Sequence, residues 1–228
     1  YLVKGVRIDI FDERLFNAEV ESSAAIGKHN IGTKGFGASQ QEGNVGPRYA
    51  EGFGEASIGT YTFYFEGGLI SYIRFLTESE EPKHQSIFYE AKENEGIMVE
   101  TAFQYLEEVV GKEFSFANNI YTGEGGMHIT GFRSALTRAL NDYARKEGYL
   151  KGKDDNLTGD DAREGLATVV SVKLREPQFE GQTKAKLGNP EARTAVEAVL
   201  SEAIPDWLER NPNDARAIME KVILAAKA

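Results

Sequence analysis

Hydrophobic residues change their spacing several times along the chain, and this change is the strongest constraint on its fold. Some segments alternate apolar and polar residues, as strands with one buried face do, whereas others carry apolar residues at intervals of three and four, as helices do. Residues 166–174 are apolar at most positions, which predicts a mostly buried strand. The remaining strand-like segments are residues 6–10, 60–65, 86–91, 97–106 and 114–116. This mixture of strands and helices predicts an α+β fold built as a two-layer sandwich.

Two helices are predicted in the middle of the chain. The first follows Gly68 and is closed by residues 78–82, and the second is long, follows Gly126 and is expected to stop near Gly148. A polar turn at residues 94–96 joins two of the predicted strands, which indicates a β-hairpin. Helical and strand-like segments therefore alternate in the central part of the sequence.

Two further helices are predicted at the C-terminal end, over about residues 189–227. Asn189-Pro190 and Asn211-Pro212 each place an N-cap asparagine before a proline at the first helical position. Pro205 lies inside the first of these helices. It predicts a kink, because proline lacks an N–H donor and its ring clashes with the preceding turn.

Composition limits the classes of function that the chain can have. It contains 228 residues, no cysteine and a formal net charge of −10. Disulfides and thiolate metal sites are therefore excluded, which suits a cytoplasmic protein. No signal peptide pattern is visible, and no apolar run approaches the roughly 18 residues of a membrane span. An acidic chain is repelled by DNA at long range, so any DNA contact must come from a few locally placed cations.

Motifs for phosphate and metal binding are incomplete. Residues 32–37 match a G-x-x-G-x-G pattern, but the G-K-[ST] ending of a P-loop is missing and no clear helix follows, which favours a flexible glycine loop. Residues 154–165 resemble the opening of a calcium loop, but Gly165 stands where the bidentate glutamate is needed. We therefore predict no metal site.

Other polar residues of this region favour structural roles. Thr158 followed by Asp161 is better explained as a capping box for a short helix. The three histidines, His29, His84 and His128, are too scattered in the sequence to propose a metal site or a catalytic triad.

Two groups of cations could contact phosphate. Arg133 and Arg138, with Arg145 and Lys146, lie along the long predicted helix, although their spacing alone favours a solvated face with acid partners such as Asp142. In the polar loop of residues 180–186, a lysine at the tip can reach a phosphate as a mobile point charge, and a solvated surface lysine is the alternative.

Six sequence motifs follow one another in the second half of the chain. They are Phe116-Ala117-Asn118-Asn119-Ile120, Gly125-Gly126-Met127-His128, the segment 131–138 (GFRSALTR), the segment 158–166 (TGDDAREGL), Val170-Ser171-Val172-Lys173 and the segment 179–184 (FEGQTK). In their order and spacing, over about a hundred residues, these motifs resemble the family of gyrase B and its topoisomerase IV counterpart. Phe65-Glu66-Gly67-Gly68 extends the resemblance toward the N-terminus. Gyrase and topoisomerase IV share these motifs.

The resemblance implies a transducer domain, spanning residues 1–228, with a fold similar to the second domain of ribosomal protein S5. It implies that Lys184 contacts the γ-phosphate of ATP held by the neighbouring GHKL-type ATPase domain, in a catalytic role. Gln182 and Thr183 belong to the same nucleotide contact. Arg133 lines the cavity through which double-stranded DNA passes. The full enzyme is an isomerase that uses ATP and Mg²⁺ to supercoil DNA, and Mg²⁺ is not bound by this chain.

The resemblance also implies partners and departures. The partners are the ATPase domain of the same polypeptide, a second gyrase B molecule in an ATP-dependent dimer, gyrase A and DNA. Met127 stands where the family usually has threonine, and the glycine-rich residues at about 17–59 are expected to be an insertion. No motif of the ATPase domain itself is present, so the chain alone is expected to be inactive. A binding or scaffold module with the same S5-like fold and no nucleotide role is the alternative.

Overall fold

The computed structural model describes residues 7–11, 60–64 and 67–227, which fall into two units with a boundary after Gly68. In the first unit, strands β1 (Arg7–Phe11) and β2 (Thr60–Tyr64) pair antiparallel, with Ile8 opposite Phe63. Both strands were predicted from their alternating pattern. The predicted insertion at residues 17–59, the glycine motif at 32–37 and His29 lie outside the described residues.

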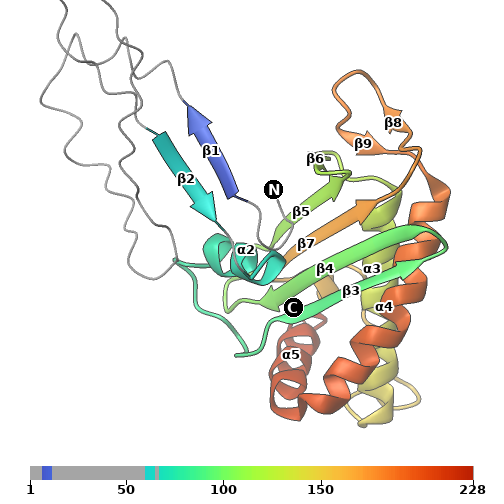
Figure 1. Cartoon of the computed structure of the whole chain (residues 1–228). Helices are drawn as coiled ribbons and strands as arrows, with labels where there is room; N and C mark the ends of the chain where they lie inside the picture. Colours follow the sequence, from blue (N-terminus) through green and yellow to red (C-terminus); the bar gives the residue numbers. More distant parts are fainter. Residues whose placement is uncertain (1–6, 12–59, 65–66, 228) are drawn as a thin grey trace, which may run out of the picture. The chain divides into compact units, whose positions relative to one another are not determined.

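The second unit is built on a five-stranded sheet with the order β3-β4-β7-β5-β6 (Figure 1). Its strands are β3 (Phe88–Asn94), β4 (Ile97–Tyr105), β5 (Lys112–Ala117), β6 (Ile120–Tyr121) and β7 (Leu166–Lys173). Strand β5 runs parallel to β7, and the other neighbours are antiparallel. The predicted β3–β4 hairpin is confirmed, and its turn uses positive φ angles at Glu95 (49°) and Gly96 (80°).

Helices α3 (Met127–Lys146) and α4 (Pro190–Arg210) pack together on one face of this sheet (Figure 1). Helix α5 (Pro212–Ala225) follows α4 after a single residue. The core between sheet and helices consists of fully buried apolar side chains, among them Val99, Phe103, Val170, Phe132, Leu136, Val196 and Leu200. The predicted α+β fold, with a layer of helices on a sheet, is confirmed.

The second face of the sheet is covered in part by helix α2 (Leu69–Leu76). Its buried residues Leu69 and Ile73 pack against Ala102 and Val169 of the two central strands. Strand β7 is therefore covered on both faces, which explains why all of its residues except the last are buried and why its sequence is almost continuously apolar.

The two C-terminal helices begin where the Asn-Pro pairs predict, but neither asparagine caps its helix through its side chain. Asn189 instead accepts a hydrogen bond from the backbone of Gln178 at 2.6 Å and donates to the carbonyl of Glu176 at 3.1 Å. The predicted N-cap positions are therefore confirmed, whereas the buried side-chain amide of Asn189 satisfies the preceding loop rather than the helix. Helix α4 continues through Pro205.

No helix among the described residues is long and apolar enough to cross a membrane.

Candidate functional site

Gln182, Thr183 and Lys184 lie together on an exposed loop between the short strands β8 (Phe179–Glu180) and β9 (Lys186–Leu187). The loop turns at Gly181 and Lys184, which both have positive φ angles, 73° and 54°. The ammonium of Lys184 lies 5.9 Å from the centre of the Phe179 ring. A lysine held over an aromatic ring remains accessible to an anion from the solvent side.

The base of this loop is attached to the beginning of helix α3. The backbone nitrogen of Glu124 donates to the carbonyl of Ala185 at 2.9 Å, and that of Leu187 donates to the carbonyl of Gly125 at 3.1 Å. Gly126 has a φ of 137°, and a Cβ atom there would lie 2.5 Å from the nitrogen of Leu187. Glycine is therefore required at this position both by the backbone conformation and by the close approach of β9.

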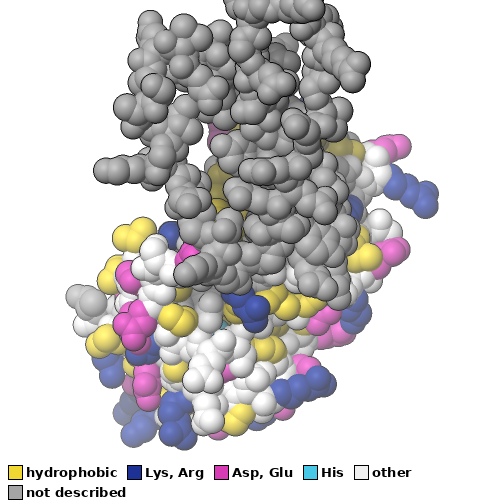
Figure 2. Space-filling model, turned by 60° about the vertical axis from the view of Figure 1, so that its left-hand side comes forward, with side chains coloured by type: hydrophobic (Ala, Val, Ile, Leu, Met, Phe, Trp, Pro, Cys, Tyr) yellow, Lys and Arg dark blue, Asp and Glu magenta, His cyan; other side chains and the backbone are white. Residues whose placement is uncertain are grey.

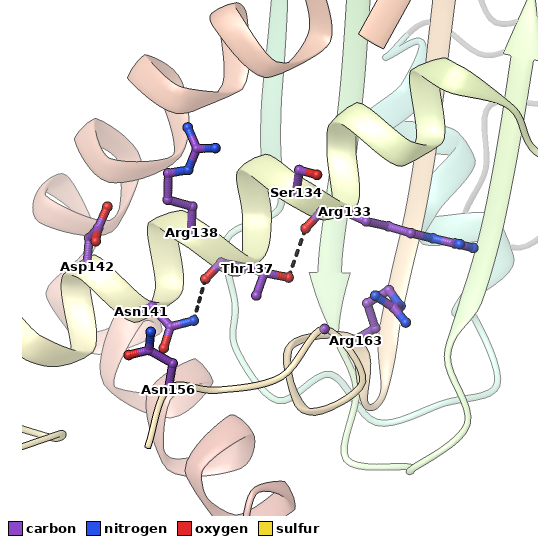
Figure 3. A pocket seen from close by; sticks show the side chains of 9 residues that line it. Arg133, Ser134, Thr137, Arg138, Asn141, Asp142, Asn156 and Arg163 are labelled. Atoms are coloured by element: carbon purple, nitrogen blue, oxygen red, sulfur yellow. Dashed lines mark hydrogen bonds between the residues drawn. The ribbon is translucent and has the colours of Figure 1, made fainter. Parts of the chain in front are cut away.

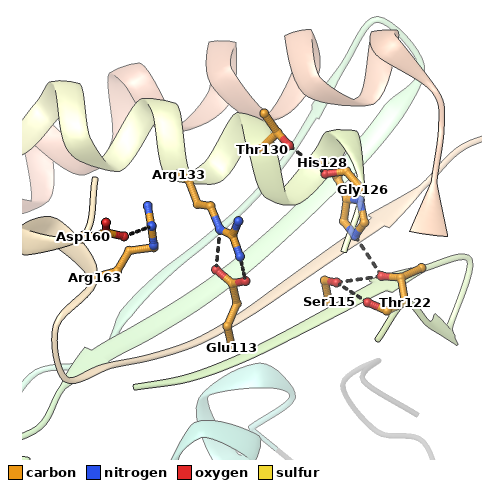
Figure 4. A network of polar contacts seen from close by, with 9 residues as sticks. All are labelled: Glu113, Ser115, Thr122, Gly126, His128, Thr130, Arg133, Asp160 and Arg163. Carbon is orange, nitrogen blue, oxygen red and sulfur yellow. Dashed lines mark hydrogen bonds and ion pairs between the residues drawn. The ribbon is translucent and has the colours of Figure 1, made fainter. Parts of the chain in front are cut away.

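A buried chain of polar side chains holds the same end of α3 to strand β5 (Figure 4). The Nε2 atom of His128 lies 3.2 Å from the hydroxyl of Thr122, which lies 2.7 Å from the hydroxyl of Ser115. His128 is fully buried, and burial lowers its pKa to about 4. The imidazole is therefore neutral near pH 7 and acts as a structural contact.

His84 is likewise structural. It is buried, its Nε2 atom accepts a hydrogen bond from the backbone nitrogen of Tyr105 at 2.9 Å, and burial lowers its pKa to about 4.

Arg133 lies further along α3 and pairs with Glu113 of strand β5 (Figure 4). Its Nε atom donates to one carboxylate oxygen at 3.0 Å, and its Nη2 atom donates to the other. Hydrogen bonding to Glu113 raises the pKa of Arg133, and the charge of Asp160 acts in the same direction. Of the Arg133 side chain, 44% is exposed, so the pair is accessible to solvent.

The acid partner that the sequence suggested for these cations, Asp142, forms no ion pair with them among the described residues. It lies on α3 itself, whereas the partners come from other segments. Arg145 donates to the side chain of Asn156 at 3.0 Å, and Lys146 pairs with Glu209 at 2.5 Å. The side chain of Arg138 has no hydrogen bond or ion pair within the described part of the chain.

A polar hollow of about 490 Å³ opens beside Arg133 (Figure 3). It is lined by Arg133, Ser134, Thr137, Arg138, Asn141, Asp142, Asn156, Gly159 and Arg163. The guanidinium of Arg138 is directed away from those of Arg133 and Arg163 (Figure 3). Arg163 pairs with Asp160 at 2.6 Å. The lining of the hollow therefore combines three arginines with polar groups and one acid, Asp142, which suits a weakly held polyanion better than an apolar ligand.

The segment that resembles a calcium loop forms a different structure. Thr158 and Asp161 exchange hydrogen bonds, at 2.7 Å from the Thr158 nitrogen and 3.2 Å from the Asp161 nitrogen, which confirms the predicted reciprocal pairing. Asp161 is the first residue of a short 3₁₀ helix, η2 (Asp161–Arg163), whose N-cap position is held by Asp160 rather than by Thr158. Within the described ranges, no three His, Asp or Glu side chains are placed to hold a metal ion.

The structure therefore brings Gln182, Thr183 and Lys184 together and places Arg133 on the helix that begins directly after the residues that anchor their loop. The sequence did not indicate Glu113 or Phe179 as partners of these cations. Alternation along β5 is the signal that could have identified Glu113, because residues 113, 115 and 117 of a strand share one face.

Comparison with known proteins shows which family the sequence matches. The sequence matches the DNA gyrase B family over residues 68–228. It is 52% identical to a DNA gyrase B protein of Bacillus mycoides over 166 residues, which cover 73% of this chain and 41% of that protein. It is 49% identical to the DNA gyrase B protein of Clostridium acetobutylicum over 167 residues, which cover 73% of this chain and 26% of that protein.

Solved structures agree with this match. The 43K ATPase domain of Thermus thermophilus gyrase B superposes with a TM-score of 0.68 at 42% identity, covering 74% of this chain and 45% of that one. The topoisomerase IV ATP-binding domain of Francisella tularensis gives a TM-score of 0.61 at 30% identity, covering 72% and 44%. The chain thus spans less than half the length of these relatives.

Proposed function

The chain belongs to the DNA gyrase B family, and we propose that it is the transducer domain of an ATP-dependent type II DNA topoisomerase, which couples ATP binding and hydrolysis to strand passage and supercoiling. One observation carries this proposal. The exposed loop of Lys184 is hydrogen-bonded to residues 124–125, directly before helix α3, and the same helix presents Arg133. A single rigid element therefore joins a candidate phosphate contact to a candidate DNA contact.

Lys184 is suited to contact the γ-phosphate of ATP that a neighbouring GHKL-type ATPase domain would hold. It is an exposed cation, it shares its loop with the donors of Gln182 and Thr183, and it has no carboxylate partner in the described part of the chain. A charge-assisted contact of this kind contributes about 1.5–3 kcal/mol net. Because the contact exists only while the γ-phosphate is present, it favours one arrangement of two domains over another.

The same cation could assist hydrolysis. A lysine placed at the γ-phosphate would stabilise charge that develops in the transition state, an effect of about 10²–10³ in rate for one donor. ATP supplies the bond that is cleaved, and Mg²⁺ would be held in the ATPase domain. This chain contributes the position and charge of Lys184 and is expected to be inactive alone.

Arg133 is suited to contact the DNA segment that is transported. The face of the molecule in Figure 2 shows Lys and Arg among Asp and Glu over the described residues. Together with the net charge of −10, this mixture suits guidance and release of a duplex better than retention. In this proposal the partners are the ATPase domain, a second gyrase B molecule, gyrase A and double-stranded DNA, in the cytoplasm.

The proposal is tested by joining the chain to its own upstream ATPase domain and measuring ATP turnover with Lys184→Ala and Lys186→Ala. Lys186 is the matched control, because it lies two residues away and pairs with Glu180 at 2.9 Å. We expect Lys184→Ala to reduce turnover by about 10²-fold or more, since it removes one transition-state donor, and Lys186→Ala to retain it.

Equal turnover in both variants would favour the scaffold alternative instead. An unchanged circular dichroism spectrum of Lys184→Ala is the required control, and it is expected because the side chain is exposed.

A further inference from the structure

Arg133 is already occupied in this structure. The carboxylate of Glu113 accepts hydrogen bonds from both the Nε and Nη2 atoms of the guanidinium. A phosphate group would use the same two donors. The two charges cancel, so Arg133 presents little net positive charge to an approaching DNA backbone. A simple phosphate contact by Arg133 would require this pair to open.

The backbone fixes the direction of Glu113. On β5, Ser115 and Ala117 face helix α3, where Ser115 joins the polar chain of His128 and Ala117 lies in the main core. Phe114 and Phe116 face the opposite side and pack beside α2. Because side chains alternate along a strand, Glu113 belongs to the α3 face and is aimed at that helix.

Positive and negative charges are also balanced in the hollow beside Arg133. Its three arginines, Arg133, Arg138 and Arg163, are matched by three acids, namely Glu113 and Asp160 as partners and Asp142 in the lining. Of these arginines only Arg138 lacks a partner within the described residues. The charge of the hollow is therefore close to neutral, and Glu113 contributes to this neutrality by pairing directly with the candidate DNA contact.

We propose that Glu113 is a positioning residue for DNA passage, an intramolecular anion that competes with a backbone phosphate of duplex DNA for the guanidinium of Arg133. This inference rests on the proposed DNA contact of Arg133. In this arrangement DNA displaces Glu113 when it contacts Arg133, and Glu113 re-forms the pair when the duplex leaves. The competition weakens the contact and promotes release of the transported segment.

Competition has a measurable signature in the salt dependence of DNA binding. An unpaired arginine that neutralises one phosphate releases a condensed counterion and adds about 0.9 to the slope of log affinity against log salt. In the wild type, Arg133 exchanges the carboxylate of Glu113 for a DNA phosphate. The released carboxylate must then be neutralised by a counterion from solution, so the net counterion release is small. Removing the carboxylate should therefore steepen the slope as well as tighten binding.

The experiment uses the whole 228-residue chain and a short, labelled DNA duplex, with anisotropy measured from about 50 to 200 mM salt. We expect Glu113→Gln to bind about fivefold more tightly than the wild type at low salt, the upper range for an exposed ion pair, with a slope steeper by about 0.9. The matched control is Glu93→Gln, which removes the same charge from an exposed position on edge strand β3 and should have a smaller effect on both quantities. Arg133→Ala in the Glu113→Gln background should abolish the gain.

The outcomes separate the two proposals. If Arg133→Ala weakens binding but Glu113→Gln has no more effect than Glu93→Gln, the role of Glu113 is overturned and the DNA contact of Arg133 stands. If no variant binds the duplex at low salt, or if Arg133→Ala is neutral in both backgrounds, the contact of Arg133 is overturned together with the competition.

Discussion

Strand β5 and helix α3 are joined by two polar contacts that lie close in sequence but differ in environment. One is the chain of Ser115, Thr122 and His128, which is buried, neutral and closed to solvent. The other is the pair of Glu113 and Arg133, which is charged and partly exposed. Only one residue of β5 separates Glu113 from Ser115, yet the two sites have opposite properties.

Burial explains the difference. When a buried polar group loses its hydrogen-bond partner, the full cost of its desolvation is left uncompensated. The chain of Ser115, Thr122 and His128 is therefore constrained to one arrangement. An exposed ion pair contributes about 0–1 kcal/mol, so its members can exchange partners with little effect on the fold. The first contact can hold the base of the Lys184 loop in place, and the second can respond to an anion.

The strongest test of the buried end of helix α3, which holds the base of the Lys184 loop, is a substitution at Gly126. We expect Gly126→Ala to lower the free energy of unfolding by about 3–5 kcal/mol, because alanine strains a φ of 137° and its Cβ collides with the backbone of Leu187. Gly96→Ala is the control, since it also has a positive φ, 80°, but nothing lies within 4 Å of its Cβ. Urea unfolding measures both variants. Equal losses at the two positions would contradict a tight junction between α3 and β9.

The buried histidine predicts a dependence on pH. Burial lowers the pKa of His128 to about 4, from 6.5. The unfolded chain therefore binds more protons between these values, and the stability from the neutral imidazole is complete above pH 6.5 and is lost as the pH falls toward 4. The expected loss is about 2–3 kcal/mol, at roughly 1.4 kcal/mol per pH unit.

His128→Gln isolates this effect, because glutamine keeps a polar group near Thr122 but does not titrate. Urea unfolding between pH 7 and pH 4.5 should show a shallower decline in the variant than in the wild type. His84→Gln is a parallel case, since burial lowers the pKa of His84 to about 4 as well. Identical slopes in wild type and His128→Gln would show that the imidazole is accessible to protons in the folded chain.

Much of the fold could be predicted from the sequence because periodicity reports burial. The continuous apolar run of β7 and the stripe of α3 were located within a residue or two of their observed bounds. The start of β3 was placed two residues too early, at residue 86, because the backbone of Ser86 is bonded to Asp214 of α5. That contact joins segments far apart in sequence, and no local pattern reports it.

The candidate site was less predictable for the same reason. Spacing placed Arg133 on a helix face and suggested an acid on the same helix, whereas its partner Glu113 comes from a strand twenty residues earlier. The resemblance supplied the roles of Lys184 and Arg133, which stay predictions. Neither spacing nor resemblance indicated that Glu113 is the partner of Arg133, because this pairing depends on how β5 and α3 are placed in three dimensions.

The exposed contact should have the smallest effect on stability. We expect Glu113→Gln and Arg133→Gln each to change the free energy of unfolding by less than about 1 kcal/mol, and 1 M salt to reduce even this difference, because solvent and ions screen a partly exposed pair. Urea unfolding of the two single variants and the double variant gives the coupling between them. A coupling free energy well above about 1 kcal/mol would show that the pair of Glu113 and Arg133 is a structural contact, as the buried contact of Ser115, Thr122 and His128 is. Glu113 would then be too tightly held to exchange with a phosphate, and the contrast along β5 would fail.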